Sequence, residues 1–146
     1  MIGIIVVGHI HFSSGLRSSV EAIVGEQKKI KFIDFLPSKS AEQLQVSMEE
    51  AIVECHQGQG VLIMTDILGG TPCNRAIALL TDTKQSNIRV VTGSNLPMIA
   101  NACLERDNCT LDELVQFVLD IGHQSVCSVT SLENEDMNDN ITDDGL

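Results

Sequence analysis

Four short apolar runs, separated by segments with helical spacing, constrain the fold of this chain more than any other feature. Two of the runs, IGIIVV (2–7) and GVLIMT (60–65), are continuous and largely β-branched, which is typical of strands buried on both faces. The other two, KIKFIDF (29–35) and IRVVTG (88–93), have a charged start and an apolar body. Because strand and helix patterns alternate, we predict an α/β fold with a parallel sheet and right-handed crossovers.

The last third of the chain departs from this alternation. Two further helices are expected after Pro97, at about 97–106 and 111–122, and the second begins with a Thr110 and Glu113 capping box. The segment SVCSVT (125–130) predicts a short last strand, either antiparallel or paired with another subunit. Residues 131–146 hold six acidic residues and no Lys or Arg, so we expect one domain over residues 1–130 and a disordered acidic tail.

Composition excludes several classes of partner. The formal charge of −11 disfavours a nucleic-acid backbone or an anionic membrane, and the absence of Trp and Tyr removes the usual stacking platforms for single strands. The longest apolar stretch, residues 2–7, is far below the roughly 20 residues that span a bilayer. Five cysteines without a CxxC pattern favour reduced thiols, so we expect a soluble, cytoplasmic protein.

Polar side chains follow the apolar runs at the expected carboxyl ends of two strands. Open α/β sheets bind ligands beyond these ends, and His9 and Asp66 would end neighbouring strands if the first three strands pair in the order 2-1-3. A carboxylate that accepts from one imidazole nitrogen leaves the lone pair of the other nitrogen free to attack. We therefore predict that His9 and Asp66 form the reactive pair. The alternative is an Asp that caps a turn beside a structural His.

The segment TDILGGTPCN (65–74) predicts a helix N-terminus at the same edge. Pro72 suits the first helical position, with Thr71 before it as N-cap and with Gly69 and Gly70 free to take unusual dihedral angles. Such a terminus offers free amides and partial positive charge to a phosphoryl group or a carboxylate. The nucleotide patterns GxxxxGK[ST] and GxGxxG do not occur, so a nucleotide site is not indicated.

The remaining polar residues near this edge give weaker evidence of a functional role than His9 and Asp66. His11 is either a second ligand or simply exposed, and without further ligands in a suitable pattern we expect no metal. Ser13 and Ser14 begin the first helix, where N-capping is their usual role. A serine nucleophile commonly lies in a GxSxG elbow, and this motif is missing from the sequence. The cysteines are expected to be buried thiols.

Several of these segments resemble a known family in their order and spacing. IGIIVVGHIHFSSGL, GEQKKIKFIDF, GVLIMTDILGGTPCN, VVTGSNLPM and TLDEL are similar to the IIA component of the mannose-class sugar phosphotransferase system, from residue 1 to about 130. The resemblance implies an open three-layer sandwich with strand order 2-1-3-4 and a short C-terminal strand that is antiparallel or swapped. It also implies that His9 is phosphorylated, that Asp66 supports it and that Thr71 lies near the phosphoryl group.

The resemblance further implies partners and a pathway. The carrier protein HPr would donate the phosphoryl group and a IIB component would accept it, with the membrane components IIC and IID involved only indirectly and no cofactor required. A homodimer is expected, and the pathway leans toward an amino sugar such as N-acetylgalactosamine or galactosamine. The shallow face shared by both partners is expected to include four apolar residues: Phe12, Ile67, Leu68 and Met98.

One departure from the family pattern bears on the site. Family members usually have Gly directly after the histidine, whereas this chain has Ile10 followed by His11, which gives His11 some claim as an alternative site. We prefer His9 because it lies at the strand end. The main alternative function is an anion or small-molecule binding module without covalent phosphorylation; a receiver-like module with Asp66 as acceptor and a hydrolase based on His9 and Asp66 fit less well.

Overall fold

The computed structural model describes residues 1–81 and 87–130, and a parallel four-stranded sheet forms its centre. The strands lie in the order β2-β1-β3-β4, which confirms the order expected from the family resemblance. All three pairings are parallel, and β1 pairs with β2 on one side and with β3 on the other. The bounds are β1 (Gly3–His9), β2 (Ile30–Phe35), β3 (Val61–Thr65) and β4 (Ile88–Val91).

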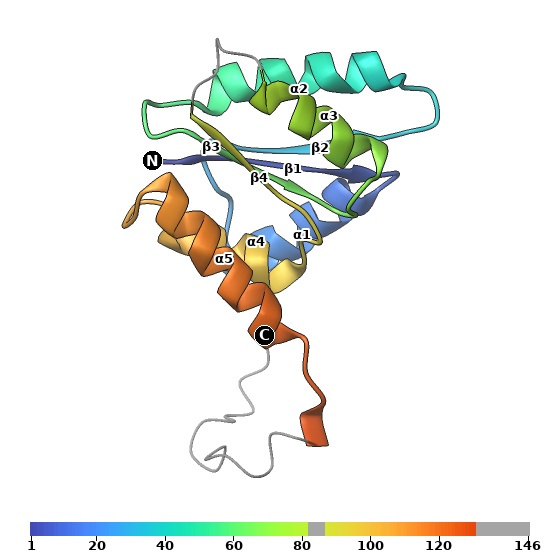
Figure 1. Ribbon diagram of the computed structural model, residues 1–146. Helices are drawn as coiled ribbons and strands as arrows, with labels where there is room; N and C mark the ends of the chain where they lie inside the picture. The colour runs from blue at the N-terminus through green and yellow to red at the C-terminus, as the bar shows by residue number, and fades with distance from the viewer. Residues whose placement is uncertain (82–86, 131–146) are drawn as a thin grey trace.

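Helices cover both faces of the sheet and complete a three-layer α/β sandwich (Figure 1). Two helices, α2 (Ala41–Cys55) and α3 (Thr71–Leu80), lie on one face. The other face carries α1 (Phe12–Val24), α4 (Leu96–Glu105) and α5 (Leu111–Ser125). The two helices expected after Pro97 are thus confirmed, although α4 begins one residue earlier and α5 extends three residues further than the sequence pattern indicated.

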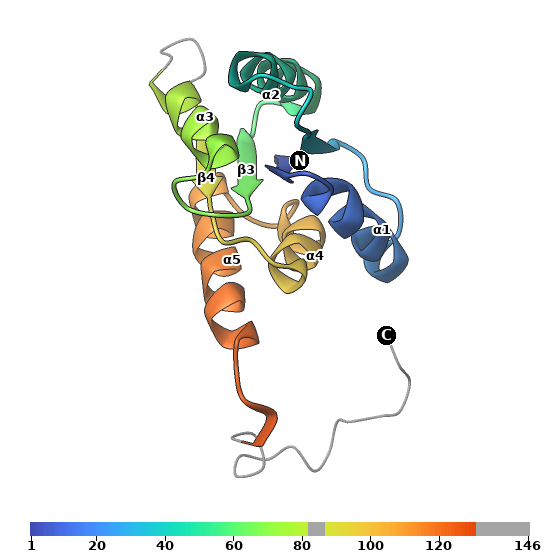
Figure 2. The same ribbon diagram turned by 90° about the vertical axis from the view of Figure 1, so that its right-hand side faces the viewer.

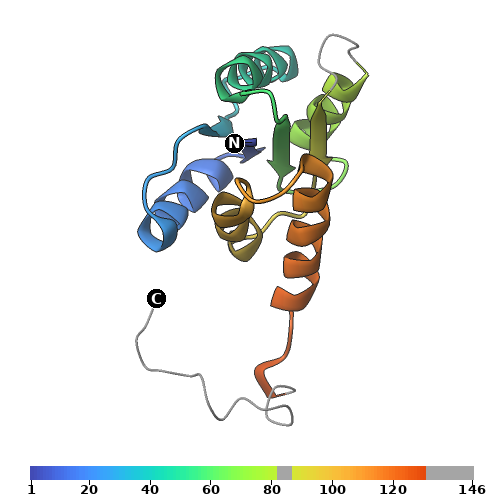
Figure 3. The ribbon, with the colours of Figure 1, turned by 90° about the vertical axis from the view of Figure 1, so that its left-hand side faces the viewer.

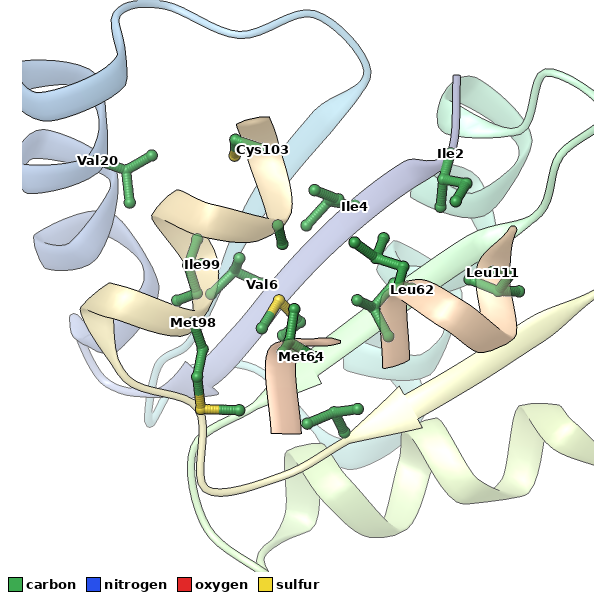
Figure 4. Packing of buried hydrophobic residues seen from close by; sticks show 14 residues of the cluster. Ile2, Ile4, Val6, Val20, Leu62, Met64, Met98, Ile99, Cys103 and Leu111 are labelled. Carbon is green, nitrogen blue, oxygen red and sulfur yellow. The ribbon is translucent and has the colours of Figure 1, made fainter. Parts of the chain in front are cut away.

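The central strand β1 explains why both faces are apolar. Alternate side chains of a strand point to opposite faces, so Ile4 and Val6 enter the core beneath α1, α4 and α5. Ile5 and Val7 enter the second core, beneath α2 and α3, and all four side chains are fully buried. Figure 4 shows the first core, in which β1 and β3 side chains meet residues from α1, α4 and the start of α5. Burial of each such side chain stabilises the fold by about 1.5–3 kcal/mol.

Helix ends follow the predicted capping pattern in α5 but not in α1. The Thr110 hydroxyl accepts from the Glu113 amide while the Glu113 carboxylate accepts from the Thr110 amide, which confirms the capping box. The expectation that Ser13 or Ser14 caps α1 is wrong. Ser13 is buried within the first turn, and the amide of Ser14 instead donates to Asp34 Oδ1 of β2 at 2.9 Å. A carboxylate from a neighbouring strand therefore stabilises the N-terminus of α1.

The short strand expected at 125–130 does not form within this chain. Ser125 is still the last residue of α5, and residues 126–130 contain no strand and are exposed. Figures 1 and 3 show α5 running away from the sheet edge, so this segment has no neighbouring strand among the described residues with which to form hydrogen bonds. The predicted acidic tail, residues 131–146, lies outside the described residues. Within residues 1–81 and 87–130, no helix is both long enough and apolar enough to cross a membrane.

Candidate functional site

The carboxyl ends of β1 and β3 place His9 and Asp66 at one edge of the sheet. His9 is the last residue of β1, and Asp66 directly follows β3. The two strands are neighbours, with Val7 paired to Thr65, so the loops that continue from them leave the sheet side by side. Figure 2 views the molecule from this edge, where the connections into α1 and α3 begin.

His9 and Asp66 are joined by two short hydrogen bonds. Asp66 Oδ2 lies 2.7 Å from His9 Nδ1 and accepts from the His9 backbone amide at 2.7 Å, while Oδ1 accepts from the Ile67 amide at 2.8 Å. An ionised carboxylate only accepts hydrogen bonds, so the proton of a neutral His9 ring is on Nδ1. The lone pair is then on Nε2. The ring is thus oriented with one nitrogen held and the other available to react.

The environment of Asp66 keeps its carboxyl group ionised. Its side chain is only 12% exposed, and this burial by itself would raise its pKa. The hydrogen bonds from the His9 amide, the His9 ring and the Ile67 amide outweigh burial, and the pKa of Asp66 lies below its ordinary value. The His9 side chain is 42% exposed, so the pair has a shielded carboxylate and an accessible imidazole.

The N-terminus of α3 lies against the His9 ring, but its cap differs from the one we predicted. Gly70 occupies the N-cap position without a side-chain bond, and Thr71 is already the first helical residue, so the prediction of Thr71 as N-cap is wrong by one position. The reason is that Gly70 takes an ordinary extended conformation, with φ −72° and ψ 162°. The unusual dihedral falls on Gly69 alone, with φ +81°.

Close approach, and not backbone freedom, explains the glycine at position 70. A Cβ atom there would lie 2.7 Å from His9 Cε1, well inside normal contact distance. The imidazole ring therefore packs directly against the first residue of the α3 terminus, where backbone amides lack partners within the helix. Thr71 and Cys73 supply such amides, whereas Pro72 has none. This arrangement places a ring nitrogen with a free lone pair beside a helix end of the kind that can bind anions.

Two further residues that shape the site were not identified from the sequence. Gly8 makes room for Phe12, because a Cβ at position 8 would overlap Phe12 Cδ1 and lie 3.0 Å from Asp66 Oδ2. Phe35, at the end of β2, meets the His9 ring edge-on at 5.9 Å between centroids. The sequence carries a weak signal for Gly8, a glycine directly before the strand-ending histidine. Phe35 carries no such signal, because its contact depends on strand pairing.

Only part of the predicted partner surface lies exposed at the edge of the sheet that holds His9. Ile67 and Leu68 are 58% and 74% exposed, and Phe12 is partly buried between Gly8 and the core. The prediction for Met98 is wrong, because Met98 is 3% exposed. The first turn of α4 directs it into the core, where its sulfur lies against Gly122 of α5.

His11 lies apart from His9 and Asp66. Its side chain is 73% exposed, and its Nδ1 lies 3.3 Å from Asp34 Oδ2 on the β2 side of β1. Burial would raise the pKa of Asp34, but bonds from Ser14 and His11 outweigh it and lower that pKa. Across residues 1–81 and 87–130, no group of three or more His, Cys, Asp or Glu side chains is arranged to hold a metal ion.

Comparison with known proteins places this geometry in a family. The family model EIIA-man, described as the PTS system fructose IIA component, matches residues 3–119. A sorbose-specific EIIA component of Lacticaseibacillus casei is 32% identical over 127 residues, which is 87% of this chain and 90% of that protein. The mannose-specific EIIAB component of Escherichia coli K12 is 30% identical over 126 residues, which is 86% of this chain.

Solved structures agree with these sequence matches. The crystal structure of phosphotransferase system component EIIA from Streptococcus agalactiae superposes with a TM-score of 0.83 at 32% identity, covering 90% of this chain and 99% of that one. The mannose/sorbose-specific IIA subunit from Enterococcus faecalis has a TM-score of 0.77 at 26% identity, over 88% of this chain and 94% of that one. The matched region is 38% of the length of the E. coli EIIAB protein, so it corresponds to one part of that protein. The chain belongs to the EIIA-man family of phosphotransferase-system IIA components.

Proposed function

We propose that this protein carries a phosphoryl group on Nε2 of His9 and passes it along a sugar phosphotransferase pathway. The observation that carries the proposal is the 2.7 Å contact between His9 Nδ1 and Asp66 Oδ2, because it leaves Nε2 as the free nucleophile. Family membership supports the same activity, since EIIA components are phosphohistidine carriers.

The transfer step exchanges one phosphorus–nitrogen bond for another. The lone pair of His9 Nε2 attacks the phosphorus of a phosphohistidine on the donor protein, in line with the bond that breaks. The donor imidazole, protonated on its second nitrogen during transfer, leaves as a neutral ring. His9 keeps its Nδ1 proton and becomes the protonated phosphoimidazole, and the ionised Asp66 carboxylate stabilises the positive charge that develops on the ring.

The N-terminus of α3 would hold the phosphoryl oxygens. The amides of Thr71 and Cys73 and the Thr71 hydroxyl are the donors nearest in sequence to Gly70, against which the His9 ring packs. Preorganised donors of this kind are worth about 3–4 kcal/mol to a transition state when the oxygens meet them directly. No nucleotide, metal or other cofactor is required, because the donor is already a phosphoamidate.

We further propose the partners of this carrier and the sugar of its pathway. We assign phospho-HPr as the donor and a IIB component as the acceptor, both in the cytoplasm, with the membrane components IIC and IID served indirectly. The relatives are named for mannose, sorbose and fructose. For this chain we propose an amino sugar such as N-acetylgalactosamine or galactosamine. Deleting the gene should abolish growth on that sugar and spare growth on mannose; the opposite pattern would overturn the sugar assignment.

We also propose that the protein is a homodimer in which residues 126–130 of one copy contact the other. Val126 and Val129 are each 77% exposed, and an apolar segment of this kind gains by burial in a partner. Light scattering at micromolar concentration should give twice 15.8 kDa. A clean monomer would refute this assembly while leaving the phosphoryl carrier intact.

The activity is tested by labelling through the pathway. Radiolabelled phosphoenolpyruvate, purified enzyme I and HPr are mixed with wild-type protein and with the His9→Ala and His11→Ala variants. We expect acid-labile, base-stable label on wild type and on His11→Ala but not on His9→Ala. Label that disappears with His11→Ala instead would move the site to His11. A wild-type protein that takes no label would favour the anion-binding module.

A further inference from the structure

Phe35 and His9 end neighbouring strands and face the same side of the sheet. They are direct partners in the parallel register of β1 and β2. Phe35 packs against the core beneath α2 and α3, which also contains Val7, two residues before His9. Because side chains alternate along a strand, the His9 side chain lies on this face as well. The two rings meet there, with centroids 5.9 Å apart and an interplanar angle of 67°.

The end of β2 is fixed by hydrogen bonds, so the Phe35 ring has a rigid support. The Phe35 carbonyl accepts from the Ile10 amide at 2.9 Å, directly after His9. One residue before Phe35, Asp34 Oδ1 accepts from the Ser14 amide at 2.9 Å and joins β2 to the first turn of α1. A side chain that is supported in this way can fix the orientation of the group that it touches.

The other contacts of the His9 ring come from different directions. Asp66, which follows β3, lies 2.7 Å from Nδ1. Gly70, at the start of α3, lies against Cε1, where an added Cβ would be 2.7 Å away. Strands β2 and β3 flank β1 on opposite sides, so Phe35 and Asp66 approach the ring from opposite sides. Within the part of the chain that the structure describes, Nε2 has no hydrogen-bond partner.

These contacts distinguish between two orientations of the His9 ring. A half-turn about the Cβ–Cγ bond would exchange Nδ1 with Cδ2 and break the hydrogen bond with Asp66. Nδ1 would then point to the side from which Phe35 approaches, where an aromatic hydrocarbon offers no carboxylate or carbonyl to accept its proton. A carbon edge of the imidazole, in contrast, meets an aromatic ring favourably. Phe35 therefore disfavours the flipped ring.

We propose that Phe35 is a positioning residue for phosphoryl transfer, whose ring keeps His9 in the orientation that presents Nε2 to the phosphorus. This inference rests on the proposed function. In-line attack requires the nitrogen lone pair to be aligned with the bond that breaks, so a ring that samples two orientations reacts more slowly. The bond with Asp66 fixes one atom of the ring, and the contact with Phe35 on the opposite side restricts its rotation. Phe35 acts through His9 and requires no contact with the donor protein.

The kinetic test removes the aromatic ring and keeps an apolar side chain, as in Phe35→Leu and Phe35→Met. We expect kcat for transfer from phospho-HPr to fall about three- to tenfold in both variants, with KM nearly unchanged. Phosphorylation by phosphoramidate, a small donor that needs no docking surface, should fall by the same factor. Phe35→Tyr, which keeps the ring, should restore both rates.

The spectroscopic test observes the His9 ring without any transfer. In ¹⁵N NMR of the histidine-labelled protein, at a pH where the ring is neutral, wild type should show distinct resonances for protonated Nδ1 and unprotonated Nε2. In Phe35→Leu the two resonances should move toward each other, because a less restricted ring exchanges its proton between the two nitrogens. Phe35→Tyr should give the wild-type spectrum.

Phe32→Leu is the matched control, because Phe32 lies on the same strand but packs against the core beneath α1, α4 and α5. It should lower the urea midpoint without changing either rate or the His9 resonances. Wild-type rates in folded Phe35→Leu, or equal losses of rate in Phe32→Leu, would refute the positioning role and leave the carrier function intact. A loss with phospho-HPr alone would overturn it too, because Phe35 would then contact the donor. A wild-type protein that reacts with neither donor refutes the proposed function itself.

Discussion

Gly70→Ala is the substitution whose effect the structure defines most sharply. The added Cβ would lie 2.7 Å from His9 Cε1, whereas carbon atoms in contact are separated by about 3.5–4.0 Å. The ring must therefore move by about 1 Å, and the Ile67 side chain, whose Cγ2 would lie 2.9 Å from the new Cβ, must also shift. Gly70 has φ −72°, which alanine adopts without strain, so the backbone has no reason to change.

The displacement should reduce transfer much more than stability. A misplacement of about 1 Å at a reacting group can cost about 100-fold in rate, because attack on phosphorus requires alignment. His9 is 42% exposed and can shift outward, so we expect the free energy of unfolding to fall by less than about 1 kcal/mol. The measurement is the single-turnover rate of transfer from phospho-HPr, alongside urea denaturation of the same samples.

Gly69→Ala is the matched control, because it should lower stability and leave the transfer rate unchanged. No atom lies within 4 Å of a Cβ at position 69, but φ is +81°, so the substitution should cost about 1 kcal/mol of stability and leave the His9 ring in place. Transfer by the folded Gly69→Ala protein should match wild type. Transfer by Gly70→Ala at the wild-type rate, or loss of transfer without loss of stability in Gly69→Ala, would refute a role of Gly70 in positioning the ring.

Three further predictions concern pH, capping and thiols. The pKa of Asp66 is lower in the folded than in the unfolded protein, so its stabilising contribution is present above about pH 4 and is lost as pH falls through the folded-state pKa. Urea titrations from pH 6 to pH 3 should therefore show a steeper loss of stability in wild type than in Asp66→Asn, and parallel curves would contradict this. Thr110→Ala should lower the free energy of unfolding by about 1 kcal/mol through loss of its bonds with Glu113, and an unchanged urea midpoint would contradict the capping role. Burial raises the pKa of Cys103 to about 11, so a thiol reagent located by mass spectrometry should label exposed Cys127 promptly and Cys103 only on unfolding; prompt labelling of Cys103 would show that it is not buried.

The features that the sequence predicts well depend on local patterns. The four apolar runs locate all four strands of the described residues, and the carboxyl ends of two of these runs place His9 and Asp66 at the same edge. The capping box is likewise a local pattern, because Thr110 and Glu113 lie three positions apart. Hydrophobic periodicity and helix caps depend on residues within a few positions of one another, so they can be recognised in a single sequence.

The errors arise where distant parts of the chain decide the structure. Asp34 of β2 bonds the N-terminus of α1, so neither Ser13 nor Ser14 caps it. Met98 is expected on the partner surface, but the packing of α4 against α5 buries it. A strand at 125–130 within the sheet of the same chain is excluded because α5 carries that segment away from it, whereas pairing with another subunit stays a prediction.

The central claim is that the contact with Asp66 holds Nδ1 of His9 and leaves Nε2 to accept the phosphoryl group. The most direct measurement is NMR of the phosphorylated protein with ¹⁵N-labelled histidine, in which coupling to ³¹P identifies the bonded ring nitrogen. Coupling to Nε2 of His9 and retention of the proton on Nδ1 are the expected result. Coupling to Nδ1 of His9, or to either nitrogen of His11, would contradict it.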